Sequence, residues 1–241
     1  MPRFFASSED INEKTAVLRG ADAVHIGRRL RMRLGDEITV CCEGKDYLCR
    51  IDTISDEQCG LTVLSVQAGS GEPNVRVTLY QAVPKSDKLE LIVQKAVELG
   101  AFRIVPVLTS RCVSRPDEKS FKKKRERLNK IALEAAKQCG RSIVPEVDEM
   151  ISAEECAKRL GSHELGLICY EKGGASLSET VKAGVKDIGI FIGSEGGFEQ
   201  AEVDECRSNG AEVIGMGTRI LRCETAPLAA ISIVMSLTGN M

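Results

Sequence analysis

Two glycine-rich loops in the last fifty residues carry the residue types and spacing best suited to chemistry. Residues 193–198 read Gly-Ser-Glu-Gly-Gly-Phe, and residues 215–226 read Gly-Met-Gly-Thr-Arg-Ile-Leu-Arg-Cys-Glu-Thr-Ala. Each loop follows a short apolar run and precedes a helical pattern. In α/β proteins, ligands bind where strand ends open into such loops. The two loops, about twenty residues apart, therefore predict one site built from both.

The first loop supports two interpretations. Glycines permit a positive φ and let the backbone approach a ligand closely. A tight strand-to-helix turn would use the same glycines. Glu195 is accordingly either a polar anchor for a ligand or an exposed loop acid. The loop matches neither the dinucleotide fingerprint GxGxxG nor a phosphate loop ending in Gly-Lys-Ser/Thr.

The second loop places charged groups just before a helix. The unpaired N–H groups of a helix N-terminus favour an anion or a carboxylate there. Ile220 and Leu221 could provide an apolar wall for a flat ring, and Arg222 and Glu224 could contact a ligand. Alternatively, Arg222 and Glu224 pair with each other at the helix start.

The whole-chain composition is that of an ordinary globular protein, with 43% hydrophobic and 28% charged residues in 241. No apolar run is long enough to span a membrane, and no apolar segment follows the first residues as in a secretory signal. Ten cysteines form no CxxC pair and only two histidines are present, so we expect reduced thiols in the cytoplasm and no metal site. A net charge of −2 argues against a uniformly basic nucleic-acid binder but allows local basic patches.

The first part of the chain has the pattern of a small β domain. Short strands are predicted at 38–41, 47–51 and 61–66, with a hairpin turn at 43–46. The breaker-rich segment 68–73 is typical of a linker. We therefore expect two domains, residues 1–70 and 74–241.

Beyond the linker, strand and helix patterns alternate, which predicts an α/β fold with an open, mostly parallel sheet covered on both faces. Asp87 and Glu90 have capping-box spacing, and Thr225 is placed to cap the final helix. Pro106 indicates an edge or irregular strand. The final helix is apolar nearly all round, which predicts burial in the domain or in a subunit interface. The expected strands are 75–79, 104–108, 167–170, 188–192 and 212–214; the expected helices are 87–99, 120–139, 203–208 and the segment after Thr225.

Four motifs in this order resemble the RsmE family of 16S ribosomal RNA uridine-N3 methyltransferases, which belong to the SPOUT (trefoil-knot) class. They are the two loops, residues 85–88 together with 94–100, and the helix end 134–141. The resemblance covers essentially the whole chain. It implies a C-terminal SPOUT trefoil-knot domain and, more loosely, an N-terminal PUA-like RNA-binding β-barrel.

The resemblance further implies S-adenosylmethionine as the methyl donor, bound by the loops and neighbouring strand ends. The cofactor-binding residues that it implies are Leu167, Tyr170, Ile192, Gly193, Glu195, Gly196, Ile214, Met216, Gly217, Ile220, Leu221, Thr225 and Ala226.

Transfer to uridine N3 requires positioning and removal or sharing of a weakly acidic proton. Glu195 and Glu224 are candidate bases. Arg222 is placed to stabilise negative charge on the uracil oxygens. Arg111 is a second candidate for a phosphate or base contact.

RNA binding needs cations, and two clusters supply them. They are Arg28, Arg29, Arg31 and Arg33 in the first domain, and Lys122, Lys123 and Lys124 on a predicted helix. The alternative is that these charges are simply solvated, as on many helix faces.

The expected partners are 16S ribosomal RNA or the small ribosomal subunit and a second copy of the chain, with neither metal nor membrane. The rival hypotheses are a non-catalytic RNA-binding protein that retains the fold, and a nucleotide-binding metabolic enzyme. The missing phosphate motifs argue against the latter.

Overall fold

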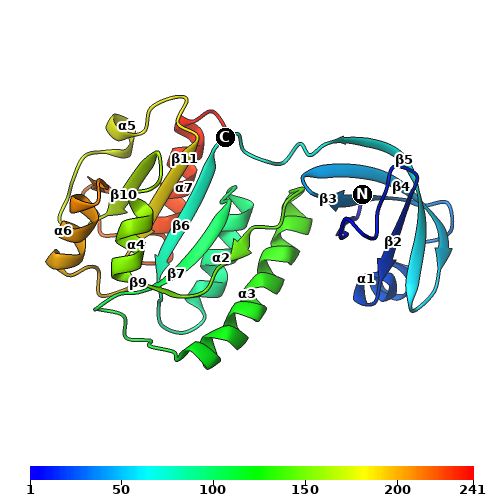
Figure 1. Cartoon of the computed structure of the whole chain (residues 1–241), viewed down its shortest axis with the longest axis horizontal. Coiled ribbons are helices and arrows are strands. Elements are labelled where there is room, and N and C mark those ends of the chain that lie inside the picture. Colours follow the sequence, from blue (N-terminus) through cyan, green and yellow to red (C-terminus); the bar gives the residue numbers. More distant parts are fainter. The chain divides into compact units, whose positions relative to one another are not determined.

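A computed structural model describes all residues from 1 to 241. The chain forms two compact units (Figure 1). Unit 1 contains residues 1–72 and 136–144, and unit 2 contains residues 73–135 and 145–241. The linker at 68–73 predicts a single boundary between the domains. The segment 136–144, however, belongs to the first unit although it lies far beyond this linker.

Unit 1 is built on a five-stranded sheet in the order β1-β3-β4-β5-β2. Alternating side chains of the central strands, such as Ile38, Val40 and Ile51, fill its core. The strands expected at 38–41, 47–51 and 61–66 are confirmed as β3, β4 and β5. The elements are β1 (Arg3–Phe5), β2 (Thr15–Arg19), α1 (Ala21–Val24), the π-helical turn η1 (His25–Arg29), β3 (Glu37–Cys42), β4 (Lys45–Ile54) and β5 (Gln58–Ala68).

The predicted hairpin joins β3 and β4. Cys42 pairs with Lys45, so Glu43 and Gly44 alone make the turn. Both have positive φ, 49° and 76°, as a two-residue hairpin with the right-handed strand twist requires. The sheet itself is open, with β1 and β2 at its two edges. A closed PUA-like barrel thus stays a prediction.

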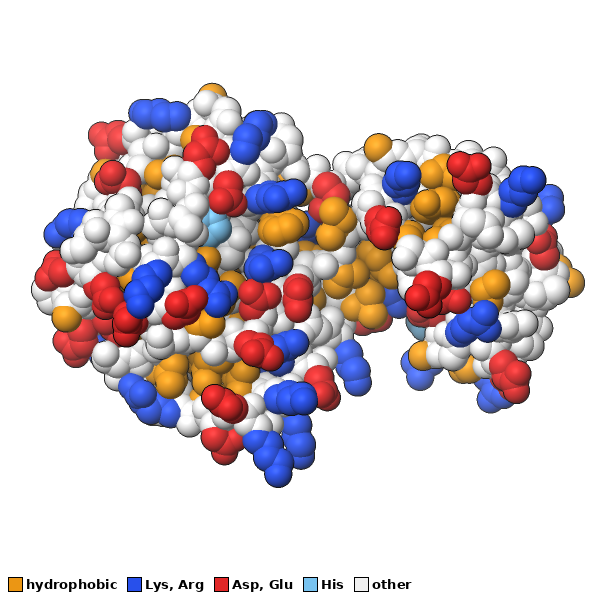
Figure 2. Space-filling model, viewed as in Figure 1, with side chains coloured by type: hydrophobic (Ala, Val, Ile, Leu, Met, Phe, Trp, Pro, Cys, Tyr) orange, Lys and Arg blue, Asp and Glu red, His pale blue; other side chains and the backbone are white.

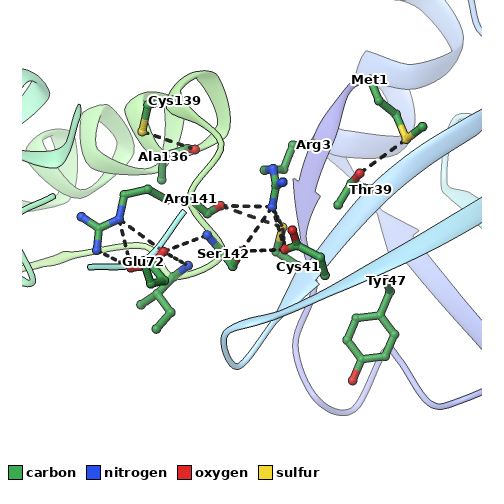
Figure 3. A network of polar contacts seen from close by, with 12 residues as sticks. Met1, Arg3, Thr39, Cys41, Tyr47, Glu72, Ala136, Cys139, Arg141 and Ser142 are labelled. Carbon is green, nitrogen blue, oxygen red and sulfur yellow. Dashed lines mark hydrogen bonds and ion pairs between the residues drawn. The ribbon is translucent and has the colours of Figure 1, made fainter. Parts of the chain in front are cut away.

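A polar network inside unit 1 ties the segment after the helix α3 (Glu118–Cys139) to the sheet and to the linker (Figure 3). The Arg141 guanidinium donates to the Glu72 carboxylate at 2.6 Å, and the Ser142 N–H donates to the same group at 2.9 Å. The Ser142 hydroxyl donates to Asp46 at 2.6 Å, and Arg3 donates to that oxygen at 2.7 Å. Only 3% of the Arg141 side chain is exposed. The end of the 134–141 motif is therefore a structural anchor of unit 1.

Replacing Arg141 with alanine is expected to lower the free energy of unfolding by about 3 kcal/mol, because the Glu72 carboxylate loses its buried counter-ion. Hydrogen exchange of the β3 and β4 amides would measure the loss in unit 1. Lys158→Ala is the control, since Lys158 pairs with Glu154 on an exposed helix surface. Its expected cost is below about 1 kcal/mol. Equally small effects of both substitutions would contradict the anchoring role.

Unit 2 contains a seven-stranded sheet in the order β12-β10-β11-β6-β7-β8, with β9 also paired to β7. All its strand pairings are parallel, which confirms the expected α/β fold with a mostly parallel sheet. The strands are β6 (Arg76–Ala82), β7 (Arg103–Leu108), β8 (Glu146–Val147), β9 (Ile151–Ser152), β10 (Leu165–Cys169), β11 (Asp187–Ile192) and β12 (Glu212–Ile214).

Helices cover both faces of this sheet. In Figure 1, α4 lies in front of the strands and α7 behind them. α4 and α6 pack together over a core that includes Tyr80, Ile168 and Phe191, whereas α7 packs against α2, β6 and β11. The helices are α2 (Lys88–Glu98), α3 (Glu118–Cys139), α4 (Ala153–Leu160), α5 (Leu177–Thr180), α6 (Gln200–Ser208) and α7 (Ala226–Leu237).

Three local expectations need correction or refinement. Asp87 and Thr225 stand at the N-caps of α2 and α7, but neither side chain makes a capping hydrogen bond. Glu90 instead pairs with Arg127 at 2.7 Å. Pro106 lies in an interior strand, between the short partners β8 and β9, where its missing N–H leaves no gap in a ladder.

The final helix buries one face and leaves apolar side chains on the other. Ala230, Ile231 and Val234 are fully buried, whereas Ile233 is 40% exposed. The uncovered side of α7 thus carries the apolar Ile233 together with the exposed Ser236. No helix in the structure has both the length and the apolar character needed to cross a membrane.

Candidate active site

A cavity of about 510 Å³ lies at the carboxyl ends of β10 and β11, beside the segment that follows β12. These three strands are neighbours in the sheet, and β6, which leads into α2, lies beside β11. Parallel strands place their carboxyl ends at one edge, so the four following segments converge there. The cavity volume falls in the range of small-molecule sites. Both predicted loops contribute to its wall, as expected.

The first loop is both a tight turn and a cavity wall, so the two interpretations of its glycines hold together. The Gly197 N–H donates to the Ser194 carbonyl at 3.0 Å, and Gly197 has a φ of +66°. The buried Phe198 ring packs edge-on against Phe191, with centroids 4.7 Å apart. This apolar anchor holds the loop onto the end of β11.

The second loop forms an exposed wall of the cavity. Gly217, Arg219 and Arg222 are exposed, and Ile220 is 83% exposed. The Arg222 carbonyl accepts hydrogen bonds from the N–H groups of Thr225 and Ala226 at 2.8 and 2.9 Å. These bonds fix the backbone of Arg222 where α7 begins. Its side chain does not pair with Glu224, so that alternative is not observed.

Arg111 braces the first loop from outside the cavity. Its guanidinium donates to the Glu199 carboxylate at 2.8 Å and to the Gly196 carbonyl at 3.1 Å. A β-carbon on Gly196 would approach the Arg111 side chain to 2.9 Å, so only glycine fits at that position. The arginine thus contacts the loop, and its contact with a phosphate or base stays a prediction.

Lys88, at the start of α2, joins the two loops. Its ammonium group lies 3.0 Å from the Glu195 carboxylate and 3.1 Å from that of Glu224. The backbone N–H of Lys85 also donates to Glu195, at 3.2 Å. Cys223 lies beside the cluster, with its sulfur 3.7 Å from the Lys88 nitrogen. We call Lys88, Glu195 and Glu224 the loop clamp.

The clamp sets the protonation of its members. Partial burial would raise the pKa of Glu195 and of Glu224, but hydrogen bonds that include those from Lys88 outweigh it and lower both pKa values. The two carboxylates, Glu195 first, raise the pKa of Lys88. Burial, with the neighbouring Glu224, raises the pKa of Cys223 to about 12. Near neutral pH the site thus contains two carboxylates, one ammonium and a thiol.

The structure places most of the predicted cofactor residues on the cavity wall. Three lie outside it: Leu167 and Ile214 are fully buried in the strands beneath, and Thr225 belongs to the start of α7. Glu224 reaches the site only through Lys88. The predicted residues that line the cavity are Tyr170, Ile192, Gly193, Glu195, Gly196, Met216, Gly217, Ile220, Leu221, Arg222 and Ala226.

Sequence reasoning gave no role to Lys88 or to Glu171, although both line the cavity. Lys88 stands inside a motif that carried the family resemblance, and Glu171 directly follows the expected wall residue Tyr170. Those adjacencies are the only signals that could have found them. Cys169, Ser194, Gly197, Phe198, Thr218, Arg219 and Cys223 also line the cavity.

The two basic clusters belong to different units. Arg28, Arg29, Arg31 and Arg33 are exposed in and after η1, and Arg28 forms an ion pair with Asp56. Lys122 and Lys123 are exposed on α3, whereas the Lys124 ammonium donates to the Ser86 carbonyl. Arg29, Arg31, Arg33, Lys122 and Lys123 thus keep exposed charges. No group of three or more His, Cys, Asp or Glu side chains is arranged to hold a metal ion.

Comparisons with known proteins find relatives over nearly the whole length of the chain. A family model described as an RNA methyltransferase domain matches residues 71–235. The chain is 35% identical to ribosomal RNA small subunit methyltransferase E of Bacillus subtilis, over 97% of this chain and 96% of that protein. A Neisseria gonorrhoeae protein of the same name, solved with bound S-adenosyl methionine, has a TM-score of 0.90 at 29% identity, covering 99% and 98% of the two chains. A Legionella pneumophila protein assigned as a methyltransferase, solved in complex with the same cofactor, has a TM-score of 0.87 at 28% identity, covering 97% and 96%.

Proposed function

The chain belongs to the ribosomal RNA small subunit methyltransferase E family, and from this premise we propose that it methylates small-subunit ribosomal RNA with S-adenosylmethionine as donor. The carrying observation is the cavity at the strand ends, whose two glycine loops are joined by Lys88. The relatives solved with S-adenosyl methionine support the choice of donor.

The residues of the cavity fit this donor. Ile192, Met216 and Leu221 offer apolar walls for a flat ring, and the glycines expose backbone N–H and carbonyl groups beside them. Sites with apolar walls and a few fixed polar groups are typical for small ligands. S-adenosylmethionine, when bound, supplies an activated methyl group without a metal. The protein then has to orient the acceptor and exclude water.

We propose uridine N3 as the acceptor, with Arg222 as the main electrostatic group. Arg222 is exposed on the cavity wall, and its guanidinium can stabilise negative charge that develops on the uracil oxygens. Glu195 and Glu224 are weak bases, because their pKa values are lowered by the loop clamp. We therefore assign them to holding the loops rather than to accepting the N3 proton.

We propose that unit 1 acts as a PUA-like RNA-binding domain and unit 2 as a SPOUT domain with a trefoil knot. The exposed arginines after η1 and the lysines of α3 are the proposed phosphate contacts. In Figure 2, basic side chains line the lower edge of the face on which Figure 1 draws α3. Such contacts give an affinity for RNA that falls steeply as the salt concentration rises. An affinity that does not depend on salt would exclude these clusters from the interface.

A homodimer in the cytoplasm completes the proposal. The exposed wall residue Ile220 and the half-exposed apolar face of α7 offer a second copy an apolar surface beside the site. The ten free thiols agree with a reducing compartment. Sedimentation of a monomer at micromolar concentration would contradict the dimer.

The function is tested in two steps with the purified chain. Calorimetry with S-adenosylmethionine tests donor binding, and absence of heat would refute the enzyme in favour of a non-catalytic RNA-binding protein. Incubation with small subunits that lack the modification, followed by nucleoside mass spectrometry, tests the acceptor. 3-Methyluridine is the expected product. Another methylated nucleoside would retain the enzyme but reject N3.

A further inference from the structure

Glu171 is an acid of the cavity wall that forms no salt bridge, although the Arg111 guanidinium attracts it from a distance. Glu195 and Glu224 share the ammonium group of Lys88, and Glu199 pairs with Arg111. Glu171 lines the cavity just after β10, yet it takes part in neither a hydrogen bond nor an ion pair.

The nearby cations are engaged elsewhere. Arg111 donates to Glu199 and to the Gly196 carbonyl. Lys172, the next residue along the chain, places its ammonium group over the Tyr170 ring, 5.6 Å from the centroid. The Glu171 carboxylate is therefore not occupied by a salt bridge and can contact a ligand.

The carboxylate of Glu171 lies against the first loop. A β-carbon on Gly197 would come within 2.9 Å of one carboxylate oxygen and 3.1 Å of the other. The glycine at this position, with its positive φ, thus leaves the space that the carboxylate occupies. The backbone before it is fixed, because the Tyr170 N–H donates to the Ile214 carbonyl at 2.8 Å. The Glu171 carboxylate therefore lies beside the first loop, where the chain leaves β10.

We propose that Glu171 binds the positively charged methionine end of S-adenosylmethionine. This inference rests on the function proposed above. The donor carries two cations, a sulfonium and an α-ammonium, on the part of the molecule that lies beyond its adenosine. A carboxylate on the cavity wall that no salt bridge occupies is the complementary group. Glu195 cannot substitute for it, because the loop clamp already satisfies that carboxylate.

The test is the affinity of the Glu171→Gln variant for three ligands, measured by calorimetry. S-adenosylmethionine carries both cations, S-adenosylhomocysteine carries only the ammonium, and methylthioadenosine carries neither. Loss of the charged contact is expected to weaken S-adenosylmethionine about tenfold. Methylthioadenosine should bind the variant and the wild type equally. S-adenosylhomocysteine distinguishes the two cations. Its affinity for the variant falls only if Glu171 binds the ammonium group.

Controls separate this proposal from the one on which it rests. Glu212→Gln removes an exposed carboxylate at the start of β12 and is expected to leave all three affinities unchanged. Glutamine keeps the shape of Glu171, and thermal unfolding checks that the variant folds. Unchanged affinity for S-adenosylmethionine, or an equal loss for all three ligands, would overturn the role of Glu171 alone. A wild-type protein that fails to bind S-adenosylmethionine would overturn both proposals.

Discussion

Replacing Arg222 with alanine is expected to lower kcat for RNA methylation by about 100- to 1,000-fold, the range found when a preorganised charge-stabilising donor is removed. Arg222 lines the cavity with an exposed side chain. Its carbonyl supports the first turn of α7, and alanine leaves that backbone contact in place. The fold should therefore survive, which circular dichroism and thermal unfolding would check.

Two further variants make this result specific. Arg222→Lys retains a positive charge and should recover part of kcat, although lysine lacks the planar donor array of arginine. Arg207→Ala removes another exposed arginine, which lies on α6 near Asp204, and should leave turnover unchanged. If Arg222→Ala instead raises KM for RNA with kcat intact, then Arg222 only binds RNA and does not stabilise charge during transfer.

Elements with a strong periodic pattern could be predicted from the sequence, and short ones could not. The alternating strands β3 and β4 and the long helix α3 follow from local hydrophobic spacing. The two-residue strands β8 and β9 carry no pattern of their own, because β7 defines them by pairing. The predicted capping box at Asp87 is not formed for a related reason. The side chain of Glu90 pairs instead with Arg127, which lies far along the chain.

The same distinction applies to the site. Glycines at strand ends are a local signal, so both loops could be located in advance. Lys88 has no local signal, because its partners come from loops far along the chain; it is 135 residues from Cys223. The contacts of Arg111 with the first loop had no local signal either, because only the fold places Glu199 beside it. Residue type therefore identified the loops, whereas tertiary contacts determine which charges are already satisfied.

Replacing Lys88 with methionine is expected to lower kcat/KM by about 100-fold, because the two loops lose their shared cation and the cavity wall shifts. The variant leaves the carboxylates of Glu195 and Glu224 facing each other without the ammonium group between them. The two carboxylates then repel each other, and this repulsion displaces the exposed second loop. Arg222 moves with this loop because it is part of it. Affinity for S-adenosylmethionine should fall as well, which calorimetry would measure.

Adding Glu195→Gln to the Lys88→Met variant should restore much of this loss, because it removes one of the two uncompensated carboxylates. The two substitutions are then strongly non-additive, as expected for groups in direct contact. If the kcat/KM losses of the two single substitutions simply multiply in the double variant, Lys88 contacts the substrate independently of Glu195.

The pH dependence provides a second readout of the loop clamp. In the wild type the pKa values of Glu195 and Glu224 are lowered, so the clamp is complete above their ordinary values and is lost only as the pH falls through the lowered ones. Without Lys88, both carboxylates lose one of the groups that lower their pKa values and repel each other, so both pKa values rise above those of the wild type. Protonation then relieves the repulsion, so donor affinity of the Lys88→Met variant should improve as the pH falls from neutral toward mildly acidic values. The wild type should show no such gain, and a variant whose affinity is equally flat over that range would contradict the clamp.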